Sequence, residues 1–117
     1  MATAFFPGGG YVLPVHITAI GTAQTVDVVV PHGGRITKVA GVSSGANASA
    51  ASVVSVTNGA STAVASLSFG ASYAAHTVVE DTSIENATVA EGDVLRVATD
   101  GAGDGAAAAT VTIFVEV

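Results

Sequence analysis

The chain has 117 residues, of which 50% are hydrophobic and 10% are charged, against about 25% charged residues in typical soluble domains. Its length fits a single domain, and its three strong cations exclude the basic surface that nucleic-acid binding requires. The shortage of Lys and Arg also disfavours anionic membrane surfaces, and the absence of cysteine excludes disulfides and thiolate metal sites.

Residues 1–10 (MATAFFPGGG) are predicted to form an extended N-terminal arm, and residues 11–117 a single β-sandwich domain. Pro7 and the glycines after it are poor formers of strands and helices. No Lys or Arg precedes Phe5 and Phe6, so the segment lacks the basic start of a signal peptide, and we expect the chain to be cytosolic when it is made. Two roles for this aromatic pair stay open: a hydrophobic hook that docks on a neighbour, or a cap on the domain's own core.

After the arm come eight runs rich in β-branched residues, each closed by turn residues, which is the pattern of short strands. Pro14 inside the first run indicates an edge strand or a bulge. Asn58-Gly59 predicts a two-residue hairpin, and Gly33-Gly34 and Glu91-Gly92-Asp93 predict tight connections of the same kind. The predicted strands lie near residues 11–20, 24–30, 34–43, 51–58, 61–69, 76–80, 93–99 and 108–117.

Alternation within the last two predicted strands indicates one buried and one more open face. Leu95 and Val97 lie opposite Arg96, and Phe114 lies on the more open face of the last strand. The apolar face of that strand is predicted to hold Val111, Ile113, Val115 and Val117. No segment has a convincing helical period. Short strands at this spacing predict an all-β fold, an antiparallel β-sandwich or jelly roll of about eight strands.

Groups that could carry chemistry are few, and none of them forms a motif. His16, His32 and His76 fall in unrelated predicted elements, whereas a zinc site needs three or four convergent ligands. Residues 100–105 (DGAGDG) place two carboxylates on a glycine-rich loop but lack the further acids of a calcium-binding loop. We therefore expect a solvated hairpin tip there, and neither a metal nor a cofactor in the chain.

The acidic residues also cluster in sequence, with Glu80, Asp81 and Glu85 near Glu91 and Asp93. Paired carboxylates can catalyse glycoside hydrolysis, but that chemistry also needs a cleft with aromatic platforms, and the chain has no Trp and two Tyr. No catalytic residue can be nominated. The expectation is a protein that is not an enzyme.

The low charge content leaves Thr, Ser, Ala and Gly to form much of the surface. Such surfaces are expected on proteins that pack against copies of themselves or a larger assembly. The alternative is a small-residue-rich domain whose composition reflects a high-GC genome.

From Gly34 to Val117 the sequence resembles the head decoration, or cement, proteins of tailed bacteriophages. The resemblance is carried by RITKV at residues 35–39, the valine- and serine-rich strands around the Asn-Gly hairpin, VAEGDVLRV at 89–97, and the Ala- and Gly-rich segment that leads into TVTIFVEV at 110–117. It implies a non-enzymatic virion structural protein with a β-sandwich or jelly-roll fold. Such proteins are often homotrimers on the outer capsid surface, where they bind the major capsid protein at subunit junctions and stabilise the shell.

The residues predicted to form a protein interface are Phe5, Phe6 and Pro7 of the arm and Phe114 of the last strand. Phe114 has a second interpretation, in which it simply lies under the arm. Two other functions remain as alternatives: a phage tail, fibre or head–tail connector component, and a carbohydrate-binding β-sandwich module. The scarcity of aromatic residues counts against the second.

Overall fold

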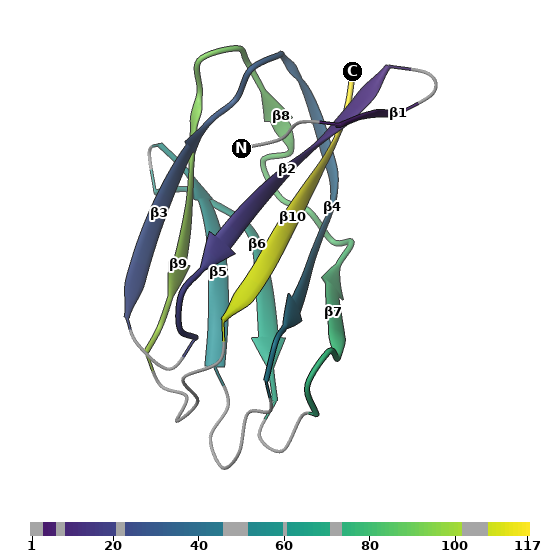
Figure 1. The fold of residues 1–117 in the computed structure, drawn as a ribbon. Coiled ribbons are helices and arrows are strands. Elements are labelled where there is room, and N and C mark those ends of the chain that lie inside the picture. The colour runs from purple at the N-terminus through teal and green to yellow at the C-terminus, as the bar shows by residue number, and fades with distance from the viewer. Residues whose placement is uncertain are drawn as a thin grey trace.

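The structure, a computed structural model, describes residues 4–6, 9–20, 23–45, 52–59, 61–70, 74–101 and 108–117. Two antiparallel sheets pack face to face as a β-sandwich (Figure 1), so the predicted all-β sandwich is confirmed. The strands are β1 (Ala4–Phe6), β2 (Gly10–Ile17), β3 (Gln24–Val29), β4 (Gly34–Ser43), β5 (Ser52–Asn58), β6 (Ala63–Phe69), β7 (Val78–Asp81), β8 (Thr88–Val89), β9 (Val94–Thr99) and β10 (Ala109–Glu116).

The sheet order is that of a jelly roll. The first sheet runs β1-β2-β10-β4-β7, with β8 also paired to β4, and the second runs β3-β9-β5-β6. From β2 onward the chain passes from one sheet to the other at every connection except β5–β6 and β7–β8. The strands β2-β10-β4-β7 of the first sheet and the four strands of the second, linked in this way, form the double Greek key of a jelly roll. All eight predicted strands are present, and β1 and β8 are additional.

Two predicted tight connections join the sheets instead of closing hairpins. Gly33 lies between β3 and β4, whose first residue is Gly34, and the turn from Glu91 to Asp93 lies between β8 and β9. The two connections are bonded together, because the Gly92 N–H donates to the Val30 carbonyl and the Val30 N–H donates to the Asp93 carbonyl, both at 2.8 Å. Turn residues indicate where a strand ends, but they do not indicate which sheet the next strand joins, so the hairpin prediction was wrong here.

The segment after Asp100 was predicted to be a hairpin tip, and this is also corrected. It connects β9 of the second sheet to β10 of the first. Residues 102–107 lie outside the described part of the chain, so the predicted solvated tip itself is not described.

The predicted hairpin at Asn58-Gly59 is present between β5 and β6, but its turn is longer than two residues. The Asn58 carbonyl accepts from the Ser61 N–H at 2.8 Å, and the Asn58 N–H donates to the Thr62 carbonyl at 3.0 Å. The positive φ falls on Ser61, at +62°, and not on the Asn-Gly pair. The Asn58 Oδ1 also accepts from the Thr62 N–H at 3.2 Å, a side-chain bond that favours the longer turn.

The arm contains a strand that the sequence analysis did not predict. Phe5 pairs with Tyr11 and Ala4 with Val12, so β1 folds back on β2 as a short antiparallel ribbon. Gly9 between them has φ of +99°, a conformation that favours glycine. The sequence analysis took the turn-forming residues only as the end of regular structure. Such residues can also reverse the chain so that a short strand before them pairs with the strand after them.

Pro14 was predicted to mark an edge or a bulge, and the structure confirms an edge. On the side away from β10, β2 pairs with β1 only as far as Val12. Beyond that point no described strand lies on this side. Proline lacks an N–H, so it is tolerated where no ladder bond is required.

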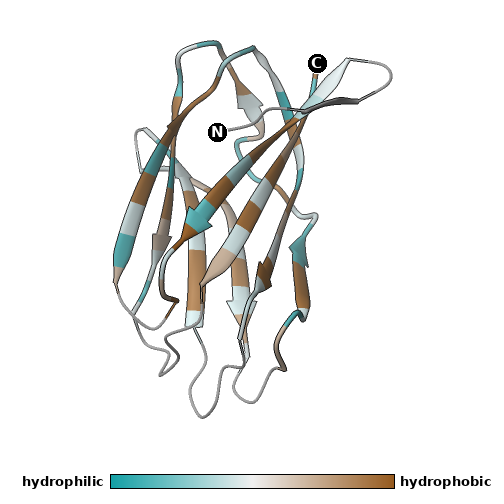
Figure 2. Ribbon diagram, in the orientation of Figure 1, coloured by the Kyte–Doolittle hydropathy of each residue, from teal (hydrophilic) through white to brown (hydrophobic). Residues whose placement is uncertain are grey.

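The core between the sheets is built mainly of valine, with Tyr11 and Phe69 as its largest fully buried side chains. Apolar and polar residues alternate along the strands (Figure 2). The predicted alternation is confirmed for Leu95 and Val97, and for the apolar face of β10 except at its last member. Val117 is 59% exposed because it lies past the end of the strand.

Candidate interaction surfaces

The structure places Phe5 and Phe6 on β1 and Phe114 on β10 of the first sheet, with β2 between the two strands. Ala4 of β1 pairs with Val12 of β2, and Val12 pairs on its other side with Phe114 of β10. Phe6 lies opposite Gly10. Pro7 lies outside the described residues, as do the side chains of Phe5 and Phe6. The choice between a hook and a core cap for this pair therefore remains a prediction.

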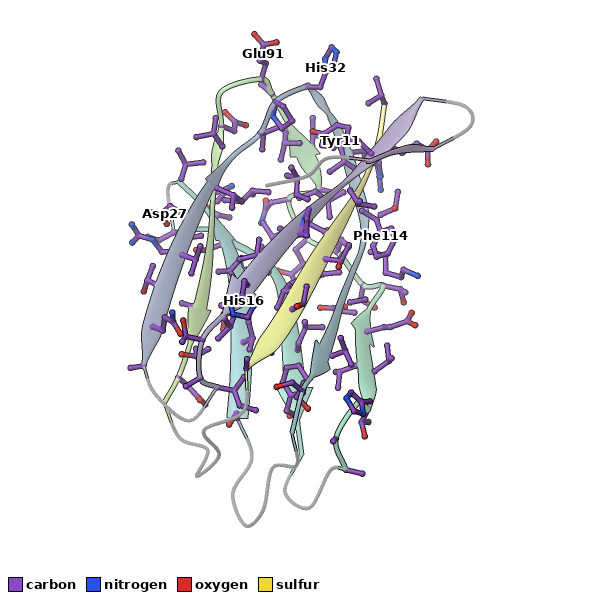
Figure 3. The ribbon with its side chains drawn as sticks, in the orientation of Figure 1. Tyr11, His16, Asp27, His32, Glu91 and Phe114 are labelled. Carbon is purple, nitrogen blue, oxygen red and sulfur yellow. The ribbon has the colours of Figure 1, made fainter. Side chains whose placement is uncertain are left out.

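Phe114 is half-buried on the outward face of the first sheet (Figure 3). The ammonium of Lys38 lies 4.5 Å from the centroid of its ring, a cation–π contact. The same ammonium lies 3.8 Å from Oε2 of Glu80. β1 extends the sheet beyond β2. Whether the arm covers the Phe114 ring remains a prediction, because the side chains of β1 lie outside the described part of the chain.

The sequence analysis did not identify Lys38 as a neighbour of Phe114, because a bulge in β4 changes which of its side chains face outward. Strict alternation would put Lys38 on the same face as Ile36, which is buried. In the structure Val115 pairs with Ile36 but Phe114 pairs with Lys38, so Thr37 is the extra residue on the bulged strand. A β-bulge shifts the following side chains to the other face, and Lys38 therefore points outward beside Phe114.

The rest of this outward face mixes charged side chains with small and apolar ones. Cross-strand partners share a face, so the register gives its members directly. Its charged residues within the described ranges are Arg35, Lys38, Glu80 and Glu116. The other members include Val12, Pro14, His16, Thr110, Thr112, Phe114, Ala40, Val42, Val78 and Thr88.

The outward face of the second sheet carries a bidentate ion pair between neighbouring strands. Arg96 Nε donates to Asp27 Oδ1 at 2.9 Å, and its Nη2 donates to Oδ2 at 3.2 Å. The two residues are directly opposite each other on β3 and β9. The hydrogen bonds from Arg96, with its positive charge, hold the pKa of the Asp27 carboxyl below its ordinary value.

This depressed pKa predicts a pH-dependent stability. A group whose pKa is lowered by folding stabilises the fold above its unfolded pKa, which is about 4 for Asp, and this contribution is lost as the pH falls through the folded value. Asp27→Asn should therefore lower the free energy of unfolding at pH 7 but not at pH 2. Urea unfolding of both proteins at the two pH values measures this. An equal difference at both values would contradict the prediction.

The acidic cluster serves the local structure of turns. The Asp81 carboxylate accepts from the Ser66 N–H at 2.9 Å and from the Ser83 N–H at 2.8 Å. The Asp93 carboxylate accepts from the Ala90 N–H at 2.9 Å. These are capping bonds of the kind that Asp commonly makes in turns, and they tie the segment after β7 to the edge of β6.

The three histidines are exposed and lie in different connections or strands. His32 occupies the bend between β3 and β4, as expected for a turn residue, and its carbonyl accepts the hydroxyl proton of Tyr11. Burial raises the pKa of that hydroxyl. Within the described residues, no group of three or more His, Asp or Glu side chains could hold a metal ion.

Shallow hollows open on the surface, including one of about 170 Å³ beside His16 and His76 and one of about 250 Å³ beside Asp81 and Glu85. The second is lined by serine, threonine, alanine and valine in addition to the two carboxylates. In the described part of the chain no helix is both long and apolar enough to cross a bilayer. The arrangement offers sheet faces and edges for contact with other molecules.

No protein-family model matches the sequence, and no curated protein sequence is similar to it. Among solved structures, a chain in the acidic stable capsid structure of Helicobacter pylori bacteriophage KHP30 superposes with a TM-score of 0.51 at 13% identity, covering 87% of this chain and 91% of that one. The two share a β-sandwich fold. The CBM36-1 domain of a multidomain xylanase from the hindgut metagenome of Trinervitermes trinervoides superposes with a TM-score of 0.50 at 14% identity, covering 97% of this chain and 85% of that one. At such identities, the likeness concerns the fold alone.

Proposed function

We propose that this protein is a non-enzymatic structural component of a bacteriophage virion, and specifically a decoration protein on the outer capsid surface. The observation that carries the proposal is the outward face of the first sheet, which spans β2, β10, β4 and β7 and where apolar side chains such as Phe114 and the 61% exposed Val78 lie among charged ones. A face of this composition favours contact with other protein surfaces. The fold that the chain shares with a chain of a phage capsid supports the same function.

The proposed partners are the major capsid protein and further copies of this chain, assembled as a homotrimer. In a trimer the first contact raises the effective concentration of the second and third, so weak individual contacts give strong overall binding. Binding to the expanded shell alone would stabilise that shell by mass action. The protein would be made in the host cytoplasm and would reside on the virion.

Sedimentation and capsid binding test this function together. We expect analytical ultracentrifugation to detect a stable oligomer, and purified protein to co-sediment with expanded capsids that lack it. A monomer that leaves such capsids bare would contradict the proposal. Cryo-electron microscopy of the particle then distinguishes a capsid position from a tail, fibre or connector position.

Removal of residues 2–10 tests the arm. If Phe5, Phe6 and Pro7 form an anchor, this deletion should reduce occupancy on capsids by about tenfold, which corresponds to ~1.4 kcal/mol. Because it also removes β1 and Gly10 of β2, thermal unfolding must show that the shortened protein remains folded at the temperature of the binding assay. The point variant Phe114→Ala, which leaves the arm intact, serves as the matched control for the sheet face. Unchanged occupancy after the deletion would assign the contact to another surface.

A carbohydrate-binding module is the second candidate, and the similarity to the CBM36-1 domain favours it. Sugar recognition commonly uses aromatic platforms, and 5% of this chain is aromatic. The residues that line the hollow beside Asp81 and Glu85 include none. A glycan array that gives no specific binding would eliminate this function.

A further inference from the structure

β3 has a backbone edge that no described strand covers. β3 pairs with β9 on one side and forms the rim of the second sheet (Figure 1). The backbone groups of Val30 bond toward Gly92 and Asp93. In an antiparallel strand both backbone groups of a residue point to the same side, and alternate residues point to opposite sides. The N–H and C=O groups of Thr25, Asp27 and Val29 therefore point away from β9, and no described residue bonds to them.

Two other edges of the sandwich are blocked, in contrast. On β2 the exposed stretch contains Pro14, which has no N–H to offer. The edge of β6 is covered, because its Ser66 N–H bonds to Asp81 and the Ala63 carbonyl accepts from the Asn86 amide at 2.8 Å. Proline and covering loops are common protections of sheet edges. The β3 edge has neither.

The side chains along this edge define what could be added to it. Thr25, Asp27 and Val29 are all exposed, and Val29 is 63% exposed next to Val94 at 37%. A strand added in line with β3 would place a side chain opposite each of them on the outward face. The central position would face the Asp27 carboxylate.

A second copy of β3 fits this edge poorly. The antiparallel register that uses all three free residues places Asp27 opposite Asp27 of the other copy. Like charges directly opposite each other destabilise a strand pair, and each chain carries a net charge of −6. The carboxylate thus protects against self-pairing while it attracts a cationic strand.

We propose that the free edge of β3 is a strand-addition site for an extended segment of a different protein, with Lys or Arg at the position opposite Asp27. The backbone groups of Thr25, Asp27 and Val29 supply the hydrogen bonds, as in other cases of β-augmentation. The cation is selected by the Asp27 carboxylate, whose oxygens keep acceptor positions beside the two that the Arg96 guanidinium occupies. This inference does not depend on a capsid function, since any partner with such a segment would satisfy it.

An NMR titration tests the site with a blocked seven-residue peptide of alternating threonine and valine with a central lysine. We expect chemical-shift changes and slowed amide exchange at Thr25, Asp27 and Val29, and an affinity roughly 3- to 10-fold above that of the peptide with central glutamate. N-methylation of the central lysine should abolish binding, because that N–H donates to the β3 edge. Equal affinities for the lysine and glutamate peptides, or no changes on β3, would overturn the proposal.

Two protein variants complete the test. Thr25→Pro removes an N–H that the fold does not use, so the protein should retain its unfolding midpoint and lose peptide binding. The double variant Asp27→Arg with Arg96→Asp retains the ion pair and reverses the sign at the edge, so the preference should change from the lysine to the glutamate peptide. Wild-type binding by the folded proline variant, or an unchanged preference in the double variant, would assign binding to a different surface.

Discussion

Phe69→Ala is expected to lower the free energy of unfolding by about 3–5 kcal/mol. The Phe69 side chain is fully buried at the end of β6. It packs toward Gly41 of β4, where an added Cβ would lie 3.0 Å from its Cζ. The close-packed core around this position can only partly close the resulting cavity. Urea unfolding measures the loss.

Phe114→Ala provides the matched comparison, since it removes the same ring from the outward face. Phe114 is half-buried and contacts Lys38, so its removal should lower the free energy of unfolding much less, by about 1 kcal/mol. If the two substitutions were equally destabilising, Phe69 would not be the main aromatic support of the core.

Gly34→Ala should destabilise the fold by about 3 kcal/mol, the upper part of the range for overpacked sites. A Cβ at this position would lie 2.6 Å from the backbone oxygen of Glu116 and 2.8 Å from Cγ1 of Val115. Because the first of these atoms belongs to the backbone of β10, no side-chain rotation relieves the contact. Thermal unfolding should show a midpoint lowered by roughly 10–15 °C.

The neighbouring glycine serves as the control. A Cβ on Gly33 would meet the Val89 carbonyl oxygen at 3.5 Å, an ordinary van der Waals distance. Gly33→Ala should therefore leave the unfolding midpoint nearly unchanged. A similar loss for both variants would indicate that the cause is chain flexibility in this connection and not the contact with β10.

Strand positions could be predicted from the sequence because period-2 patterns and turn residues are local signals. The sheet to which each strand belongs could not, since Gly33-Gly34 and the Glu91–Asp93 turn have the composition of hairpins and yet connect the two sheets. The face on which Lys38 lies could not be predicted either, because the bulge in β4 interrupts the alternation of side chains. Lys38 therefore lies on the outward face beside Phe114. Pairing with a distant strand determines such features, and a single sequence does not encode them in a readable pattern.

Of the candidate site, the outward position of Phe114 could be predicted, because simple alternation holds along β10. The cation over its ring and the free edge of β3 could not. The first depends on the bulge, and the second depends on which strand lies at the rim of the second sheet. The pairing of Asp27 with Arg96 likewise joins residues that are far apart in the chain.

The position of β10 in the sheet order has a consequence for the synthesis of the protein. β10 lies between β2 and β4, so the earliest and middle parts of the first sheet have no hydrogen-bonded connection until this late strand inserts between them. A nascent chain that still lacks β10 would expose the unpaired backbone edges of β2 and β4. Folding is therefore completed only after β10 has left the ribosome, and such non-local pairing places the folding time in the millisecond-to-second range of β-sandwiches.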